Sequence, residues 1–132
     1  MTNMQSSTCH LLFLLLAIAG AMAFSQTAVA QDAGRGKAVF EQCAACHSLD
    51  SGHNETGPYL KGIVGRKSAS VDDFIYSPAM RRANVTWTPE QLDAFLKDPQ
   101  APPFRGNRMP FAGIPEAQAR ADLVAYLQAA SR

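Results

Sequence analysis

Apolar residues recur at helical spacing in residues 32–45. The small and apolar positions fall three or four residues apart and so share one helix face: Gly36, Val39, Phe40 and Cys43. Asp32 is a suitable N-cap because its carboxylate can accept a hydrogen bond from an N–H group of the first helical turn. The pattern therefore predicts a helix. A glycine inside a helix costs up to about 1 kcal/mol relative to alanine, so Gly36 indicates the close approach of another backbone.

The final stretch, residues 115–130, also has the periodicity of a helix. It begins with a proline, which suits the first helical position, and alanines occur throughout it. Its apolar stripe consists of Leu123, Tyr126 and Leu127. We predict that this helix crosses the one over residues 32–45, although the stripe could instead pack elsewhere in the same core. The predicted contact places Gly36 and Phe40 against Leu123 and Tyr126.

Two shorter helices are predicted between these terminal ones. One covers residues 78–83, and the other has Thr88 as its N-cap and Pro89 at its first position. The apolar face of the second consists of Leu92, Phe95 and Leu96. Residues 48–71 are polar and rich in turn formers, and the proline-rich run 99–110 cannot be helical and is expected to cross the molecule as an extended loop. The fold class is therefore all-α, with long loops.

Residues 1–30 have the pattern of a secretion signal. A polar opening precedes an apolar run that begins at Leu11, and Ala28-Val29-Ala30 suits cleavage before Gln31. The alternative is an uncleaved membrane anchor. However, the uninterrupted apolar core has 13 residues, whereas a bilayer-spanning helix needs about 20. We therefore expect a signal peptide over residues 1–30 and one domain over residues 31–132.

Charge and cysteine content narrow the function of that domain. Its net charge is +1, which argues against bulk nucleic-acid binding. Two of the three cysteines follow residue 30, and both lie in one short motif, so a framework of disulfides is excluded. A domain of this size has a thin core of its own, and a bound group would add apolar surface to bury.

That motif is Cys43-Ala44-Ala45-Cys46-His47, a C-x-x-C-H pattern typical of covalent haem c attachment. Two thiols on one helical turn can each add to a vinyl group at one porphyrin edge, and His47 can then bind iron through a neutral ring nitrogen. A structural dithiol or a thioredoxin-like redox pair shares the two cysteines but needs no histidine after them. A carbonyl in Thr56-Gly57-Pro58 can accept a hydrogen bond from the other nitrogen of His47 and orient the ring.

A sixth iron ligand is predicted in the proline-rich loop. Met109 lies in Arg108-Met109-Pro110-Phe111, and a methionine thioether is a known haem ligand. Met80 falls in a predicted helix and is interpreted as a core residue that fills a gap. His53 is interpreted as a loop residue with a local hydrogen bond. An open sixth position is the alternative.

The chain from residue 31 resembles the class I cytochromes c, close to their bacterial periplasmic and mitochondrial-type members. Matching blocks occur in the family's order: 36–40, 43–47, 56–58, 62–66, 74–77, 86–87, 109–114 and 122–127. The resemblance implies a small fold with crossing terminal helices, wrapped around one covalent haem. It also implies thioether links at Cys43 and Cys46, with His47 and Met109 as iron ligands and the carbonyl of Pro58 accepting from His47.

The same resemblance implies that three further residues surround a haem propionate. Tyr76 and Trp87 would donate hydrogen bonds to it, and Arg66 would supply positive charge, as a buried carboxylate requires. From the sequence alone the two aromatics could be ordinary core residues and Arg66 a solvated surface charge. The chain departs from many relatives at Phe95, where they have tyrosine, and at Met80, where they have asparagine; both changes make the haem pocket drier.

The resemblance implies a periplasmic, monomeric electron carrier and not an enzyme. Its expected partners are redox proteins, membrane-bound or soluble, including oxidases and reductases, with peripheral contact to membrane complexes and no nucleic acid. Basic residues are expected to flank the haem edge and steer acidic partners: Lys37, Lys61, Lys97, Arg105 and Arg108. They could equally form an ordinary solvated surface. The alternative function is a haem domain with a labile sixth ligand that binds gases or acts as a peroxidase.

Overall fold

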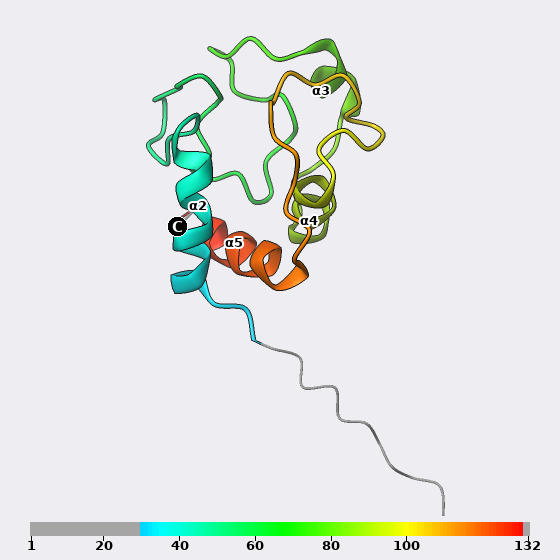
Figure 1. Cartoon of the computed structure of the whole chain (residues 1–132). Helices are drawn as coiled ribbons and strands as arrows, with labels where there is room; N and C mark the ends of the chain where they lie inside the picture. The colour runs from blue at the N-terminus through cyan, green and yellow to red at the C-terminus, as the bar shows by residue number, and fades with distance from the viewer. Residues whose placement is uncertain (1–29, 131–132) are drawn as a thin grey trace, which may run out of the picture.

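The computed structural model describes residues 30–130, in which four helices are joined by long loops (Figure 1). They are α2 (Ala33–Ala44), α3 (Pro78–Ala83), α4 (Pro89–Lys97) and α5 (Ala117–Ala130). No strand forms within residues 30–130, where a single isolated bridge joins Lys67 and Thr86, so the all-α prediction is confirmed. The expected signal peptide lies outside the described residues except for Ala30. None of the helices in the described part of the chain combines the length and apolar character of a membrane-spanning helix.

The helix ends follow the capping residues of the sequence. The carboxylate of Asp32 accepts from the N–H of Arg35 at 2.9 Å, and the hydroxyl of Thr88 accepts from Gln91 at 3.2 Å. These contacts satisfy first-turn donors that no helical carbonyl reaches. Helix α5 differs from the prediction, because it begins at Ala117, two residues after Pro115.

The terminal helices α2 and α5 cross at a glycine, as predicted (Figure 1). A Cβ atom on Gly36 would lie 2.0 Å from the carbonyl oxygen of Asp122 and 2.7 Å from the Cβ of Tyr126. Next to this contact, the rings of Phe40 and Tyr126 are 5.5 Å apart, and Leu123 is completely buried. The absence of a side chain at Gly36 therefore sets how closely the two helices approach.

A buried carboxylate stabilises the same crossing. Asp122 on α5 accepts hydrogen bonds from Arg35 Nε at 2.7 Å, the Asp32 N–H at 2.8 Å and Gln118 Nε2 at 2.9 Å. The hydrogen bond from the Arg35 guanidinium, in particular, lowers the pKa of Asp122 to about 2. The sequence indicated no special role for Asp122, because its partners on α2 are about 90 residues away along the chain.

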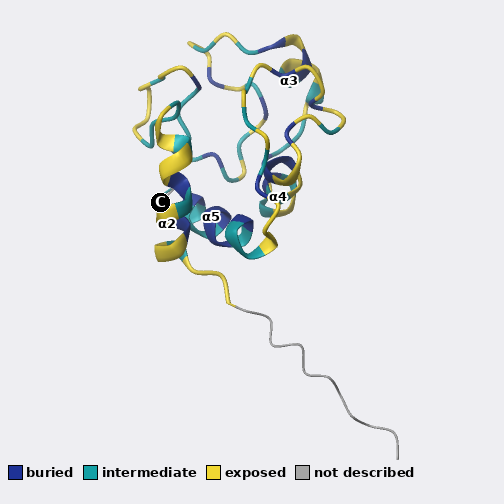
Figure 2. Cartoon of the chain, viewed as in Figure 1, coloured by how far each residue is buried: buried dark blue, intermediate teal, exposed yellow. Residues whose placement is uncertain are grey.

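The core continues from this crossing to α4 and into the proline-rich loop. Figure 2 shows buried positions on the inward faces of the helices. Phe104 of the loop is 2% exposed, stacks on Trp87 at 5.3 Å and meets Phe95 edge-on at 4.9 Å. The loop is therefore anchored in the core by an aromatic side chain.

The proline-rich loop is non-helical as predicted, but it is not extended. Successive turns fold it, with N–H groups donating to carbonyls three residues earlier: Ala101 to Asp98, Phe104 to Ala101, and Asn107 to Phe104. Prolines remove some donors, yet each of these turns needs a single N–H group. The compact form brings Phe104 into the core and returns the chain to α4.

The end of this loop is held by a backbone hydrogen bond to α4 and by the buried guanidinium of Arg120. The N–H of Ile114 donates to Leu96 O at 2.8 Å, and Gly113 has φ +99°, a conformation suited to glycine. The Arg120 guanidinium donates to the carbonyls of Ile114 and Pro115 at 2.9 and 2.8 Å and to Asp93 at 2.8 Å. These contacts fix the path of the chain from the end of the loop into α5.

Candidate haem site

The helices and loops enclose a cavity of about 610 Å³. This volume lies within the usual range for small-molecule and cofactor sites. All of the predicted site residues line it: Cys43, Cys46, His47, Pro58, Arg66, Tyr76, Trp87 and Met109. The fold thus brings Cys43 and Met109, which are 66 positions apart along the chain, to one site.

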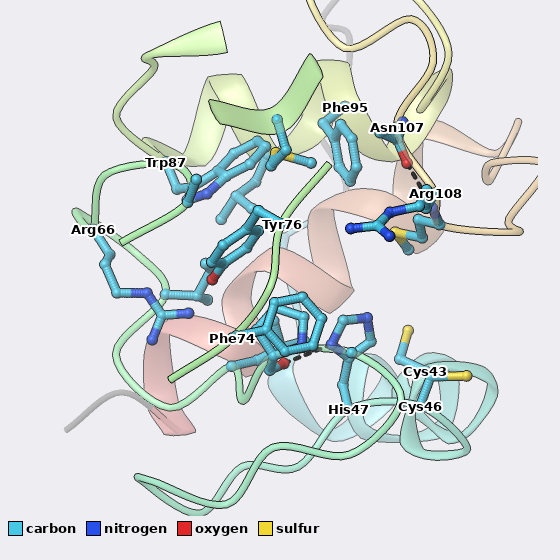
Figure 3. Close-up of a pocket in the computed structure, with 18 of the residues that line it drawn as sticks. Cys43, Cys46, His47, Arg66, Phe74, Tyr76, Trp87, Phe95, Asn107 and Arg108 are labelled. Carbon is cyan, nitrogen blue, oxygen red and sulfur yellow. Dashed lines mark hydrogen bonds between the residues drawn. The ribbon is translucent and has the colours of Figure 1, made fainter. Parts of the chain in front are cut away.

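The two cysteines lie at the end of α2. The N–H groups of Cys46 and His47 both donate to Cys43 O at 3.0 Å, so the motif continues the last turn of the helix. Burial raises the pKa of the Cys43 thiol to about 11, and the nearby Cys46 adds to the effect. In Figure 3 both sulfur atoms lie at the edge of the cavity that is remote from Arg66.

His47 has its ring fixed from one side. Its Nδ1 lies 2.7 Å from the carbonyl oxygen of Pro58, which accepts the hydrogen bond as the sequence predicted. Burial lowers the pKa of His47, and the Pro58 contact opposes this only in part. A neutral ring that donates through Nδ1 leaves Nε2 unprotonated and able to bind a metal. Figure 3 shows this ring directed into the cavity.

Gly57 contributes to this arrangement in a way that the sequence did not reveal. A Cβ atom there would lie 2.4 Å from His47 Cε1 and 2.8 Å from Nδ1. The N–H of Gly57 also donates to Cys46 O at 2.7 Å, so the loop is tied back to the cysteine motif. A glycine is therefore required for the loop to lie against the imidazole.

The far end of the cavity is polar and cationic. The Arg66 guanidinium donates to Tyr59 O at 2.8 Å and Lys61 O at 3.0 Å, and burial raises the pKa of the Tyr76 phenol. Figure 3 shows Arg66, Tyr76 and Trp87 on the same side. Lys67 lines the cavity as well, next to Arg66 in the chain, and among the residues described the lining includes no Asp or Glu. This end suits an anionic group.

Residues from the proline-rich loop and α4 form the wall opposite His47. Met109 is half-buried and lines the cavity, and its N–H donates to Asn107 Oδ1 at 2.8 Å. Phe95 and Met80 line the cavity as well, so Met80, interpreted from the sequence as a core residue, packs against the core and also faces this space. This wall is largely apolar.

His53 and the five basic residues expected around the haem edge lie mostly outside the cavity lining. His53 is exposed and makes the predicted local hydrogen bond, to Glu55 at 2.8 Å. Of the five basic residues expected around the haem edge, Arg108 lines the cavity. Lys37, Lys97 and Arg105 are exposed but do not line it, and Lys61 is half-buried.

The cytochrome c family model matches residues 33–131. The chain belongs to the cytochrome c family. It is 40% identical over 119 residues to cytochrome c2 of Blastochloris viridis, with 89% of this chain and 91% of that protein covered. It is 40% identical over 97 residues to cytochrome c-550 of Nitrobacter winogradskyi, with 73% and 88% covered. The solved structure of cytochrome cH from Methylobacterium extorquens superposes with a TM-score of 0.70 at 35% identity and covers 74% of this chain and 98% of its own.

Membership of the family, together with the C-x-x-C-H motif, establishes that this cytochrome c carries one covalently attached haem c. The residues present fit that group. Two thiols lie at one edge of an apolar cavity, an imidazole with a free Nε2 faces into it, and cationic side chains lie at the other end. The fold is accordingly that of a class I cytochrome c, as the sequence predicted.

Proposed function

We propose that this cytochrome c, a single-haem electron-transfer protein whose relatives indicate redox proteins as partners, acts in the periplasm with its iron held between His47 and Met109. The haem supplies an iron that alternates between the ferrous and ferric states without changing bonds in a substrate. The observation that carries the proposal is the cavity that His47 and Met109 line together.

Cys43 and Cys46 would hold the haem by thioether bonds at the edge of the cavity nearest α2. Before attachment both are thiols, and the raised pKa of Cys43 keeps its sulfur protonated at neutral pH. Because both cysteines belong to the end of one helix, the attachment fixes the haem relative to α2.

His47 would bind the iron through Nε2. Its Nδ1–H is committed to Pro58 at 2.7 Å, which fixes the tautomer and the ring orientation. Gly57 packs against the ring edge and prevents it from tilting toward the loop. A ligand held in this way keeps the same geometry in both oxidation states, which favours rapid electron transfer.

Met109 would complete the coordination, and Arg66, Tyr76 and Trp87 would surround a propionate at the cationic end. Methionine raises the reduction potential of a haem compared with histidine or thiolate ligands. The apolar wall that includes Phe95 and Met80 excludes water, which also favours the less charged ferrous state.

Electron exchange would take place where the haem edge meets the surface. Arg108 lies at the cavity and is exposed, so it is placed to attract an acidic patch on a redox partner, with Arg105 exposed nearby on the same loop. Such steering speeds encounter without requiring a large interface. The periplasmic location is supported by the signal-like residues 1–30 and by the bacterial relatives.

A visible spectrum of the dithionite-reduced protein, before and after carbon monoxide, tests the proposed ligation. We expect a c-type spectrum that carbon monoxide barely changes, because Met109 occupies the sixth position. The Met109→Ala variant should bind carbon monoxide rapidly and completely, and Met80→Leu should behave as the wild type. A complete shift in the wild type would contradict Met109 ligation and favour gas binding or peroxidase chemistry.

The proposed periplasmic location is tested by a separate measurement. The mass of the haem-loaded protein from a periplasmic extract should correspond to a chain that begins at Gln31. Recovery of a chain that retains residues 1–30 in the membrane fraction would support the anchor instead.

A further inference from the structure

The loop that carries Met109 is organised around one buried amide. Asn107 is 9% exposed and is separated from Met109 by a single residue. We propose that Asn107 is a positioning residue that keeps Met109 directed at the iron and thereby lowers access of external ligands to it. This inference rests on the proposed ligation by Met109.

The Asn107 side chain contacts three segments of the loop. Its Oδ1 accepts from the Met109 N–H at 2.8 Å, and Nδ2 donates to Pro99 O at 2.6 Å and to Phe104 O at 3.1 Å. Both N–H groups of the amide and one lone pair of its oxygen are therefore in use. Figure 3 shows Asn107 beside Phe95 and Arg108, with its oxygen directed into the loop.

These contacts connect Met109 to the rigid part of the molecule. Pro99 is fully buried directly after α4, and Phe104 is anchored between Trp87 and Phe95. A displacement of the Met109 backbone away from the cavity must therefore break the hydrogen bond from its N–H to the Asn107 oxygen or pull the amide from two buried carbonyls. A buried polar group left without a partner is costly, so the displaced state is disfavoured.

The chemistry of the amide makes it difficult to replace. An aspartate could accept from Met109 but would place carboxylate oxygens against the carbonyls of Pro99 and Phe104. A leucine has a similar shape but makes none of the three hydrogen bonds. A serine can accept from an N–H two residues later but cannot span to both carbonyls.

The consequence is measurable as affinity for an external ligand. Imidazole binds ferric iron only in molecules from which Met109 has moved away, so its apparent affinity scales with the fraction in that state. Removing the amide should raise this fraction. We expect Asn107→Leu to bind imidazole roughly tenfold more tightly than the wild type, and Asn107→Ser to fall between them.

The experiment is an imidazole titration of the ferric, haem-loaded protein, followed through the visible charge-transfer band that accompanies methionine–iron ligation. A matched control is Gln100→Ala. Its Oε1 accepts from the Gly106 N–H at 3.1 Å in the same loop, but the contact is exposed and does not involve Met109. Guanidinium unfolding of each variant measures global stability separately.

Tighter imidazole binding in Asn107→Leu, unchanged binding in Gln100→Ala and partial recovery in Asn107→Ser would support the proposal. Unchanged imidazole affinity in both Asn107 variants, whatever their global stability, would overturn it while leaving Met109 ligation intact. If the leucine variant does not fold, the serine variant decides by the same criterion. A wild-type protein without the methionine–iron band would refute the ligation itself, and the role of Asn107 with it.

Discussion

Replacing Gly36 with alanine would place a methyl group in the crossing of α2 and α5, where the structure leaves no room for it. The new Cβ would lie 2.0 Å from Asp122 O and 2.7 Å from the Cβ of Tyr126. The nearest atom belongs to the backbone of a helix, so no rotation of a side chain can relieve the contact. The two helices would have to separate, which loosens the packing of Phe40 on Tyr126 at the same time.

The magnitude follows from two opposing effects. Overpacking a tight contact costs about 1–3 kcal/mol, and the upper part of that range applies when backbone must move. Alanine returns up to about 1 kcal/mol, because it is the better helix former. We therefore expect the free energy of unfolding to fall by about 2 kcal/mol. For a domain of this size that corresponds to a decrease in Tm of roughly 8–16 °C.

Guanidinium unfolding of the haem-loaded protein measures the effect, with a lower midpoint and an unchanged slope expected. Gly34→Ala is a control on the same helix. Its new Cβ would meet only Asp32 Oδ1, at 3.0 Å; this atom caps the helix but belongs to an exposed side chain, which can shift by a few tenths of an ångström. This variant should match the wild type or gain up to about 1 kcal/mol. A Gly36→Ala protein as stable as the wild type would refute the reasoning.

Two other substitutions probe contacts that hold the site and the terminal helices. Gly57→Ala should force the His47 ring from its place, because the new Cβ would lie 2.4 Å from Cε1; the yield of haem-loaded protein and the visible spectrum would both change, whereas a wild-type spectrum at full yield would contradict this. Asp122 has its pKa lowered to about 2 from an ordinary 3.8, so the unfolded state takes up a proton first as the pH falls. Stability from this group is therefore complete above about pH 4 and is lost toward pH 2; Asp122→Asn should reduce the slope of unfolding free energy against pH in that window, and an unchanged slope would exclude Asp122 as the source.

The sequence allowed close prediction of features that depend on neighbours along the chain. The starts of α2 and α4 are set by Asp32 and Thr88, whose side chains reach the N–H groups of the next turn. The C-x-x-C-H motif and its meaning follow from the geometry of a single helical turn and the residues beside it. In these cases the interacting groups are few residues apart, so spacing alone specifies the contact.

Other features depended on which distant segments meet. From its residue type, Asp122 would be expected on the exposed surface of α5, yet it is buried against Arg35, 87 residues earlier. From its residue type, Asn107 would be expected in an exposed turn. Its buried side chain instead connects Pro99, Phe104 and Met109 through hydrogen bonds. No periodicity in the sequence distinguishes such a residue from an exposed one.

Residue types at short spacing were sufficient to predict the four helices to within about two residues, the attachment motif and the methionine proposed as ligand. Packing between distant segments sets how closely α2 and α5 approach, folds the proline-rich run into turns and places Gly57 against the ring of His47. These depend on the burial of polar groups and on close approach between segments far apart in the chain. Both are properties of the packed molecule, and they arise only when the loops are folded around the cavity.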